Sequence, residues 1–140
     1  MSSMKQVLKV MPILRQIVNP SQLRVAADCC RGEDREFFKS KLVELAEIFK
    51  TMPKTYETDG QGKKAIVSLH YFVSGCDWWI VEKDSDPDDA GQLQVFGYAD
   101  LGYGAEAGYI SIPEILENGG ELDFHWTPKP VQEVLNGLNR

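Results

Sequence analysis

Hydrophobic residues in the first third of the chain recur with the period of α-helices. Three runs have apolar residues every three or four positions: residues 4–18, 23–30 and 33–52. Pro12 predicts a bend or break in the first run, because proline removes a helical hydrogen bond. Asn19-Pro20-Ser21 is a stop and N-cap signal after that run, and Pro53 ends the third. The pattern therefore predicts three N-terminal helices.

After a polar, glycine-containing connector that begins at Pro53, the pattern becomes typical of strands. Apolar, aromatic and β-branched residues form five short runs: residues 65–73, 77–83, 93–99, 109–112 and 121–126. Ser74-Gly75 is a turn signal between the first two runs, which predicts a hairpin. Two short helices are predicted at residues 113–117 and 131–138.

The order of these elements indicates the fold class. Strands joined by short turns form antiparallel sheets, and helices confined to one end of the sequence are typical of the α+β class. We therefore expect N-terminal helices packed on a curved, mostly antiparallel five-stranded sheet with a short C-terminal helix. The length of 140 residues fits a single domain, in which residues 1–52 form a helical extension and residues 53–140 the β-rich part.

The net charge of −6 is distributed unevenly. Residues 1–64 hold twelve basic and eight acidic side chains, a net +4, whereas residues 65–140 hold three basic and thirteen acidic ones, a net −10. An acidic protein lacks the broad positive surface of non-specific nucleic-acid binders. The asymmetry indicates either that the two parts neutralise each other or that two surfaces address different partners.

Cysteine usage and hydropathy indicate the compartment. Three cysteines, two of them adjacent at Cys29 and Cys30, do not suggest a disulfide framework. No apolar run has the character of a signal peptide or the length of a membrane span. We therefore expect a cytoplasmic protein without membrane association, and no motif assigns it a metal or a cofactor.

The predicted strand at residues 121–126 carries the most suggestive chemistry. With a period of two, one of its faces presents Glu121, Asp123 and His125. Carboxylates and an imidazole can together bind a cation or serve as general acid and base. A polar face also arises in any half-buried strand, so solvent exposure is the alternative. His70, which shares a strand face with Phe72, is expected to be a structural histidine.

Two loops resemble ligand-binding motifs without their key features. The acidic loop of residues 84–89 lacks the central glycine and the final glutamate of a calcium-binding loop, so a solvated turn is predicted. The glycine-rich segment 100–109 precedes a strand rather than a helix, which argues against a phosphate loop. Trp78 and Trp79 point to opposite faces of one strand, so at least one is expected in the core. The candidate binding surface consists of Trp79, Tyr103, Asp84, Asp86, Asp88 and Asp89.

Several segments of the β-rich part together resemble one protein family. They are residues 53–57, His70-Tyr71-Phe72, residues 77–82, Phe96-Gly97, residues 106–115 and residues 121–125. Over roughly residues 53–130 the chain is similar to the uncharacterised bacterial domain-of-unknown-function family 2958. The resemblance implies a small bacterial cytosolic protein of the kind carried by mobile genetic elements, without established activity or cofactor. The polar residues that match the family motifs are Glu82, Asp100, Glu106, Ser111, Glu114, Asp123 and His125.

Three functions are compatible with these observations. The first is a non-catalytic binding or accessory protein of a mobile element, whose acidic, aromatic-rich surface contacts a partner protein with a basic surface. The second is a metal-dependent hydrolase or single-stranded DNA endonuclease, which requires Glu82, Glu106, Asp123 and His125 to converge. The third is nucleic-acid binding by the helical part, through Lys39, Lys41, Lys50 and Lys54. The first hypothesis is preferred.

Overall fold

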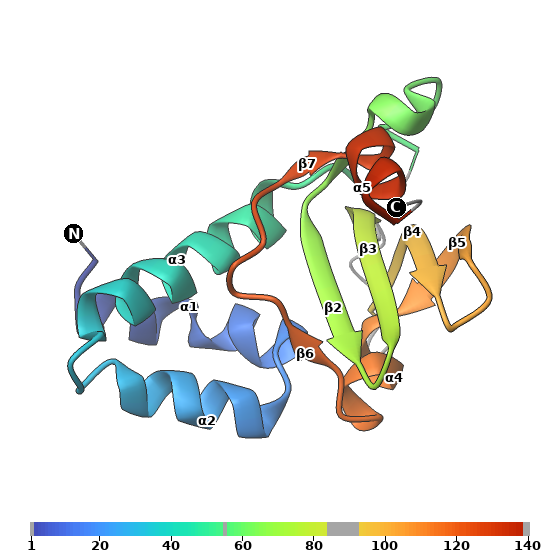
Figure 1. Ribbon diagram of the computed structural model, residues 1–140. Helices are drawn as coiled ribbons and strands as arrows, with labels where there is room; N and C mark the ends of the chain where they lie inside the picture. Colours follow the sequence, from blue (N-terminus) through green and yellow to red (C-terminus); the bar gives the residue numbers. More distant parts are fainter. Residues whose placement is uncertain (1, 55, 84–92, 139–140) are drawn as a thin grey trace.

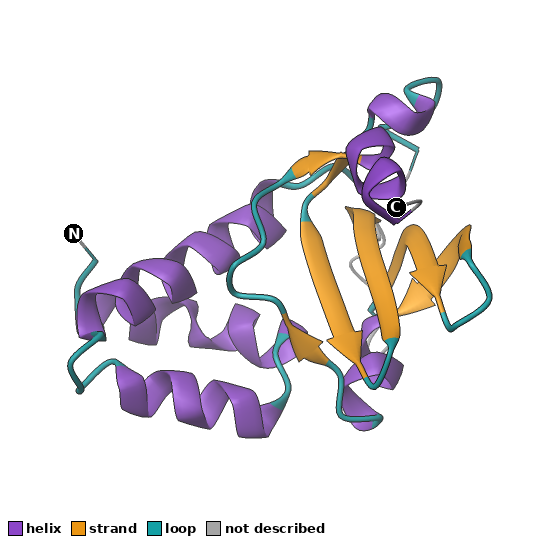
Figure 2. Ribbon diagram, viewed as in Figure 1, coloured by secondary structure: helices purple, strands orange, loops and turns teal. Residues whose placement is uncertain are grey.

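The computed structural model describes residues 2–54, 56–83 and 93–138, and it has the predicted α+β architecture (Figure 1). The helices are α1 (Met4–Ile17), α2 (Pro20–Cys29), α3 (Arg35–Thr51), the short 3-10 helix η1 (Gly62–Lys64), α4 (Ile112–Glu117) and α5 (Val131–Leu138). The strands are β1 (Ile66–Val67), β2 (Leu69–Val73), β3 (Cys76–Lys83), β4 (Gln94–Asp100), β5 (Ala105–Ser111), β6 (Glu121–Leu122) and β7 (Lys129–Pro130). Figure 2 shows α1, α2 and α3 grouped at one side of the strands.

The three N-terminal helices form as predicted. Pro12 lies inside α1, which continues as a single helix through it. Leu14 and Ile17 beyond the proline are as fully buried as Val7 before it, so packing of one continuous face compensates for the missing hydrogen bond. Helix α2 begins earlier than predicted, because the Asn19 side chain accepts hydrogen bonds from the first turn at 2.8 and 3.1 Å.

The main sheet is five-stranded and antiparallel, in the order β5-β4-β3-β2-β6. Its strands differ in detail from the predicted runs. Ser68 divides the first run, so that β1 pairs with β7 in a separate two-stranded sheet. Strand β5 begins at Ala105 rather than Tyr109. A register shift in β3 between Ile80 and Glu82 marks a bulge.

The predicted strand at residues 121–126 is wrong beyond Leu122. The Asp123 N–H still bonds to the His70 carbonyl at 2.8 Å, but the chain then turns. The Asp123 carboxylate accepts a hydrogen bond from the His125 N–H at 2.9 Å, and the Trp126 N–H bonds to the Asp123 carbonyl. An aspartate that binds the backbone two residues later stabilises a turn, so the expected row of three polar side chains does not form.

Two hydrophobic cores lie on the two sides of the main sheet. The helix-side core joins α1, α2, α3 and α4 to sheet residues such as Leu69, Ile80 and Val95. The outer core joins Val67, Trp79, Val81 and Val131 on the other side, with α5 packed against it. Tyr71 is fully buried in the helix-side core, and its hydroxyl donates a 2.5 Å hydrogen bond to the Ile17 carbonyl. Burial without a charged partner raises the Tyr71 pKa above its ordinary value.

Candidate functional site

Three of the family-matching polar residues stabilise local turns and caps. The Asp100 carboxylate accepts hydrogen bonds from the N–H groups of Gly102 at 2.8 Å and Gly104 at 3.3 Å, which closes the turn between β4 and β5. The Ser111 hydroxyl accepts a hydrogen bond from the Glu114 N–H at 3.3 Å and caps α4. Glu114 is exposed in the first turn of α4, where a negative charge complements the helix dipole.

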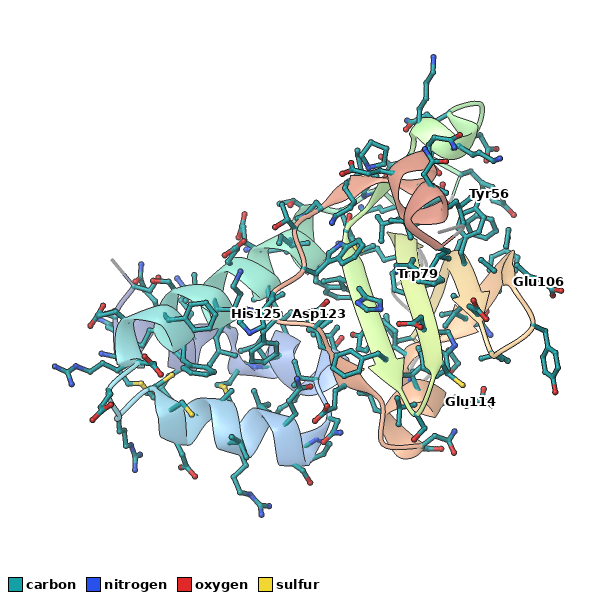
Figure 3. The ribbon with its side chains drawn as sticks, in the orientation of Figure 1. Tyr56, Trp79, Glu106, Glu114, Asp123 and His125 are labelled. Carbon is teal, nitrogen blue, oxygen red and sulfur yellow. The ribbon has the colours of Figure 1, made fainter. Side chains whose placement is uncertain are left out.

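The four residues of the hydrolase hypothesis do not form one cluster. Glu106 lies opposite Ala99, which packs against the helix-side core, so Glu106 is on the helix side of the sheet. Glu82 lies opposite Phe96 on the outer side. His125 is exposed and stacks on Phe37, with ring centroids 5.7 Å apart. Figure 3 shows Glu106 well separated from Asp123 and His125. Within the described residues, no group of three or more His, Cys, Asp or Glu side chains could hold a metal ion.

The candidate binding surface is corrected at Trp79. This side chain is only 4% exposed and belongs to the outer core, so it cannot serve as an exposed platform. Trp78 is partly buried and packs against the helix-side core. Tyr103 is 94% exposed at the β4–β5 turn. Asp84, Asp86, Asp88 and Asp89 lie outside the described residues.

His70 bridges two carboxylates, an arrangement that the sequence analysis did not anticipate. Its Nδ1 lies 2.9 Å from Asp123 Oδ2, and its Nε2 lies 2.7 Å from Asp77 Oδ1. The ring stacks on Trp79 and lies against Trp126, with centroids 5.7 and 5.1 Å away. Because both ring nitrogens are occupied, the imidazole has no nitrogen left to exchange a proton with a substrate. The bridge instead ties the chain after β6 to the β2–β3 hairpin, as expected for a structural histidine.

A cavity of about 280 Å³ opens on the outer side of the sheet, beside the outer core. Four aromatic residues line it: Tyr56, Phe96, Tyr98 and Tyr109. Thr58, Asp59 and Glu82 contribute its polar groups, and Val81 and Val131 are among its apolar ones. We call this feature the tyrosine cavity.

Glu82 organises the tyrosine cavity from within. It is 4% exposed, and its Oε1 accepts a hydrogen bond from the Tyr56 N–H at 3.0 Å. Its Oε2 accepts hydrogen bonds from the Thr58 N–H, at 2.9 Å, and from the Thr58 hydroxyl. The three bonds fasten the loop of residues 56–58 to β3. They supply hydrogen-bond donors to a buried carboxylate, whose burial without partners would destabilise the fold.

Two tyrosines of the cavity interact directly with each other. A side-chain hydrogen bond with Tyr56 raises the pKa of the Tyr109 phenol, and the nearby negative charges of Glu82 and Asp59 raise it further. Both carboxylates also line the cavity. The cavity therefore combines aromatic rings with negative charge.

A second hollow, of about 390 Å³, lies between α2, the start of α3 and the chain after β6. Phe37, Phe38 and His125 contribute to its aromatic lining. The Gln22 amide covers the edge of β6 here, donating to the Leu122 carbonyl at 2.7 Å and accepting from the Leu122 N–H at 2.9 Å. Because this backbone is already paired, the hollow does not offer a free strand edge to a peptide.

The residues of the tyrosine cavity are dispersed in the sequence. Glu82 was identified through the family resemblance, whereas Tyr56 and Phe96 appeared only as parts of its motifs. The sequence feature that indicates this site is the alternation of Phe96 and Tyr98 in one predicted strand, which places both rings on one face of the sheet. Their pairing with Tyr109 depends on the register between β4 and β5, which the sequence does not reveal.

Comparisons with known proteins leave the resemblance untested. No protein-family model, curated protein or solved structure matches this chain. The similarity to family 2958 therefore stays a prediction. None of the helices in the described part of the chain is long and apolar enough to span a membrane.

Proposed function

We propose that this protein is a non-catalytic binding protein that recognises a positively charged segment of a partner protein at the tyrosine cavity. The observation that carries the proposal is the composition of the cavity. Four aromatic residues and two carboxylates surround it, and none of its described lining residues is lysine or arginine. Such a surface is complementary to cationic side chains, because aromatic faces and carboxylates both attract positive charge.

The position of the cavity supports this proposal. It lies on the outer side of the sheet, while α1, α2 and α3 pack on the helix-side core. The side chains of Tyr56 and Tyr109 are 67% and 63% exposed, although aromatic residues of this size are usually covered. A partner can therefore approach the cavity without displacing a helix of the N-terminal group.

We further propose that the protein acts as an accessory factor of a bacterial mobile element in the cytoplasm, as the family resemblance implies. Within this role the acidic part of the chain captures the basic surface of a host or element-encoded protein. The alternative of a metal-dependent hydrolase receives no support from the described geometry, because its four candidate residues are not gathered in one site.

A defined cationic peptide tests the proposal. A fluorescent peptide of about twelve alternating lysine and serine residues is titrated with the protein at low ionic strength, about 20 mM salt, where screening is weak. A peptide with glutamate in place of lysine is the control. We expect binding of the lysine peptide alone. Equal signals from both peptides, or no binding of either, would overturn the proposal.

Matched charge variants locate the binding surface. Asp59→Asn removes one exposed carboxylate at the cavity, whereas Glu106→Gln removes one exposed carboxylate on the helix side of the sheet. We expect Asp59→Asn to weaken peptide binding about two- to fivefold and Glu106→Gln to leave it unchanged, since exposed charges act over short distances in salt. A larger loss of affinity in Glu106→Gln than in Asp59→Asn would show that the peptide binds outside the cavity.

A further inference from the structure

The walls of the tyrosine cavity are arranged to surround a compact group. Phe96 of β4 and Tyr109 of β5 are direct partners in the sheet, and their rings meet edge to face, with centroids 5.7 Å apart and planes inclined by 72°. Tyr98 projects from the same side of β4, two residues further along. Two perpendicular rings and a third beside them form a concave aromatic wall rather than a flat stacking platform.

The fourth ring is held in place at a conformational cost. Tyr56 has a φ of 71°, in the left-handed region that non-glycine residues rarely adopt. Its ring is mainly exposed, so burial of that ring does not compensate for the strained backbone. The Glu82 hydrogen bonds to Tyr56 and Thr58 hold this conformation instead. Strain that is maintained by a buried carboxylate, to position an exposed aromatic ring, is typical of binding sites.

Glu82 contributes a negative charge to the cavity, and most of the acceptor capacity of its carboxylate is already used. Its carboxylate already accepts three hydrogen bonds, all from the neutral donors of Tyr56 and Thr58. In the described part of the chain no ion pair joins it to a cation. A ligand ammonium with several N–H groups would lose hydration here and would gain few acceptors from Glu82, so it would depend on Asp59 and the tyrosine hydroxyls for hydrogen bonds. A methylated ammonium has no such requirement, because its methyl groups contact aromatic faces.

We propose that the tyrosine cavity binds the trimethylated side chain of a lysine in the partner protein. This inference rests on the proposed function and specifies the group that the partner presents. The quaternary ammonium contacts the rings of Tyr56, Tyr98 and Tyr109 through its methyl groups, and Glu82 and Asp59 balance its charge through space. Burial of the methyl groups adds apolar contact that an unmodified lysine lacks.

Three versions of one short peptide test this assignment by titration calorimetry. They differ at a single position, which is lysine, trimethyllysine or the uncharged isostere with a tert-butyl group. We expect trimethyllysine to bind more tightly than both of the others, at least about threefold. Equal affinity for trimethyllysine and the isostere would show that charge is not recognised and would overturn the inference. Choline is titrated separately, and binding of choline as tight as that of the peptide would point to a headgroup instead.

Ring-removal variants assign the effect to the cavity. Tyr109→Leu is expected to lower the affinity for the trimethyllysine peptide about two- to fivefold, the effect of one exposed cation–π contact, whereas Tyr103→Leu removes a 94% exposed ring outside the cavity and is expected to have no effect. Tyr56→Leu is the second test variant if Tyr109→Leu does not fold. An affinity for the trimethyllysine peptide that equals the wild-type value in the folded variant contradicts the inference.

The same titrations separate the inference from the proposed function. If the unmethylated lysine peptide binds as tightly as the trimethylated one, and Asp59→Asn weakens both, the protein recognises basic segments but the cavity does not select methylated lysine. If neither peptide binds, the proposed function itself fails.

Discussion

Replacing Glu82 by glutamine tests whether this buried carboxylate holds the tyrosine cavity together. Both carboxylate oxygens are acceptors in the folded protein, Oε1 for the Tyr56 N–H at 3.0 Å and Oε2 for Thr58. Glutamine has the same size but only one acceptor oxygen, and its NH₂ group must then face a backbone donor. If the glutamine oxygen takes the place of Oε2 and keeps the hydrogen bonds from Thr58, the bond from the Tyr56 N–H is lost and that N–H has no acceptor.

The expected loss in the free energy of unfolding is about 1–3 kcal/mol, the cost of an unsatisfied buried polar group. Urea denaturation measures it as a lower midpoint at an unchanged m-value. Glu106→Gln makes the same chemical change at an exposed site and is expected to stay within about 0.5 kcal/mol of the wild type. Faster amide hydrogen exchange at Tyr56 and Thr58 in the Glu82 variant provides a local readout. Equal midpoints for the two variants would refute the role assigned to Glu82.

Three further predictions concern the strained loop, the histidine bridge and the buried tyrosine. Tyr56→Gly is expected to be about 1 kcal/mol more stable than Tyr56→Ala by thermal unfolding, the reverse of the order at an ordinary position, because only glycine adopts a φ of 71° without strain. His70→Ala is expected to lose about 2–3 kcal/mol, since it leaves the Asp77 and Asp123 carboxylates without their partner, whereas the exposed His125→Ala stays near wild type; similar losses in both would contradict the bridge. Burial raises the pKa of Tyr71, so above pH about 10 only the unfolded state releases this proton and the wild type loses stability. Between pH about 9 and 11 the free energy of unfolding of Tyr71→Phe is therefore expected to fall less than that of the wild type. Parallel curves of unfolding free energy against pH for the two proteins would contradict this.

Hydrophobic periodicity predicted most of the fold because it reports which side of an element is buried. The α+β class and the N-terminal helices followed from it, and so did the central strands of the sheet. Periodicity did not predict the end of a strand where a side chain forms a hydrogen bond with the backbone. Asp123 continues the alternation of residues 121–126, yet its carboxylate accepts the His125 N–H and turns the chain. At Pro12 the sequence allowed one bent helix or two short ones, and burial on both sides of the proline accompanies a single helix α1.

The candidate site was less accessible from the sequence, because it depends on contacts between distant residues. Tyr56 and Glu82 are 26 positions apart, and their hydrogen bond requires the loop before η1 to fold over β3. Phe96 and Tyr109 meet through the register of β4 and β5. The family resemblance did include Glu82, but the sequence alone suggested a ligand or acid–base role. In the structure this carboxylate accepts hydrogen bonds from two backbone N–H groups and one hydroxyl of the loop at residues 56–58, and it supports an aromatic site.

The ion pairs give the charge asymmetry of the chain a physical interpretation. The two lysine–glutamate pairs, Lys39 with Glu36 and Lys41 with Glu44, are internal to α3. Among the described residues, no ion pair joins a lysine or arginine of residues 2–64 to a carboxylate of residues 65–138. The helices adhere to the sheet through the apolar helix-side core instead, and hydrophobic contact leaves charged groups at the surface. Within the part of the chain that the structure describes, direct pairing between the two parts therefore does not neutralise the carboxylates, and those on the outer side of the sheet remain available to a positively charged partner.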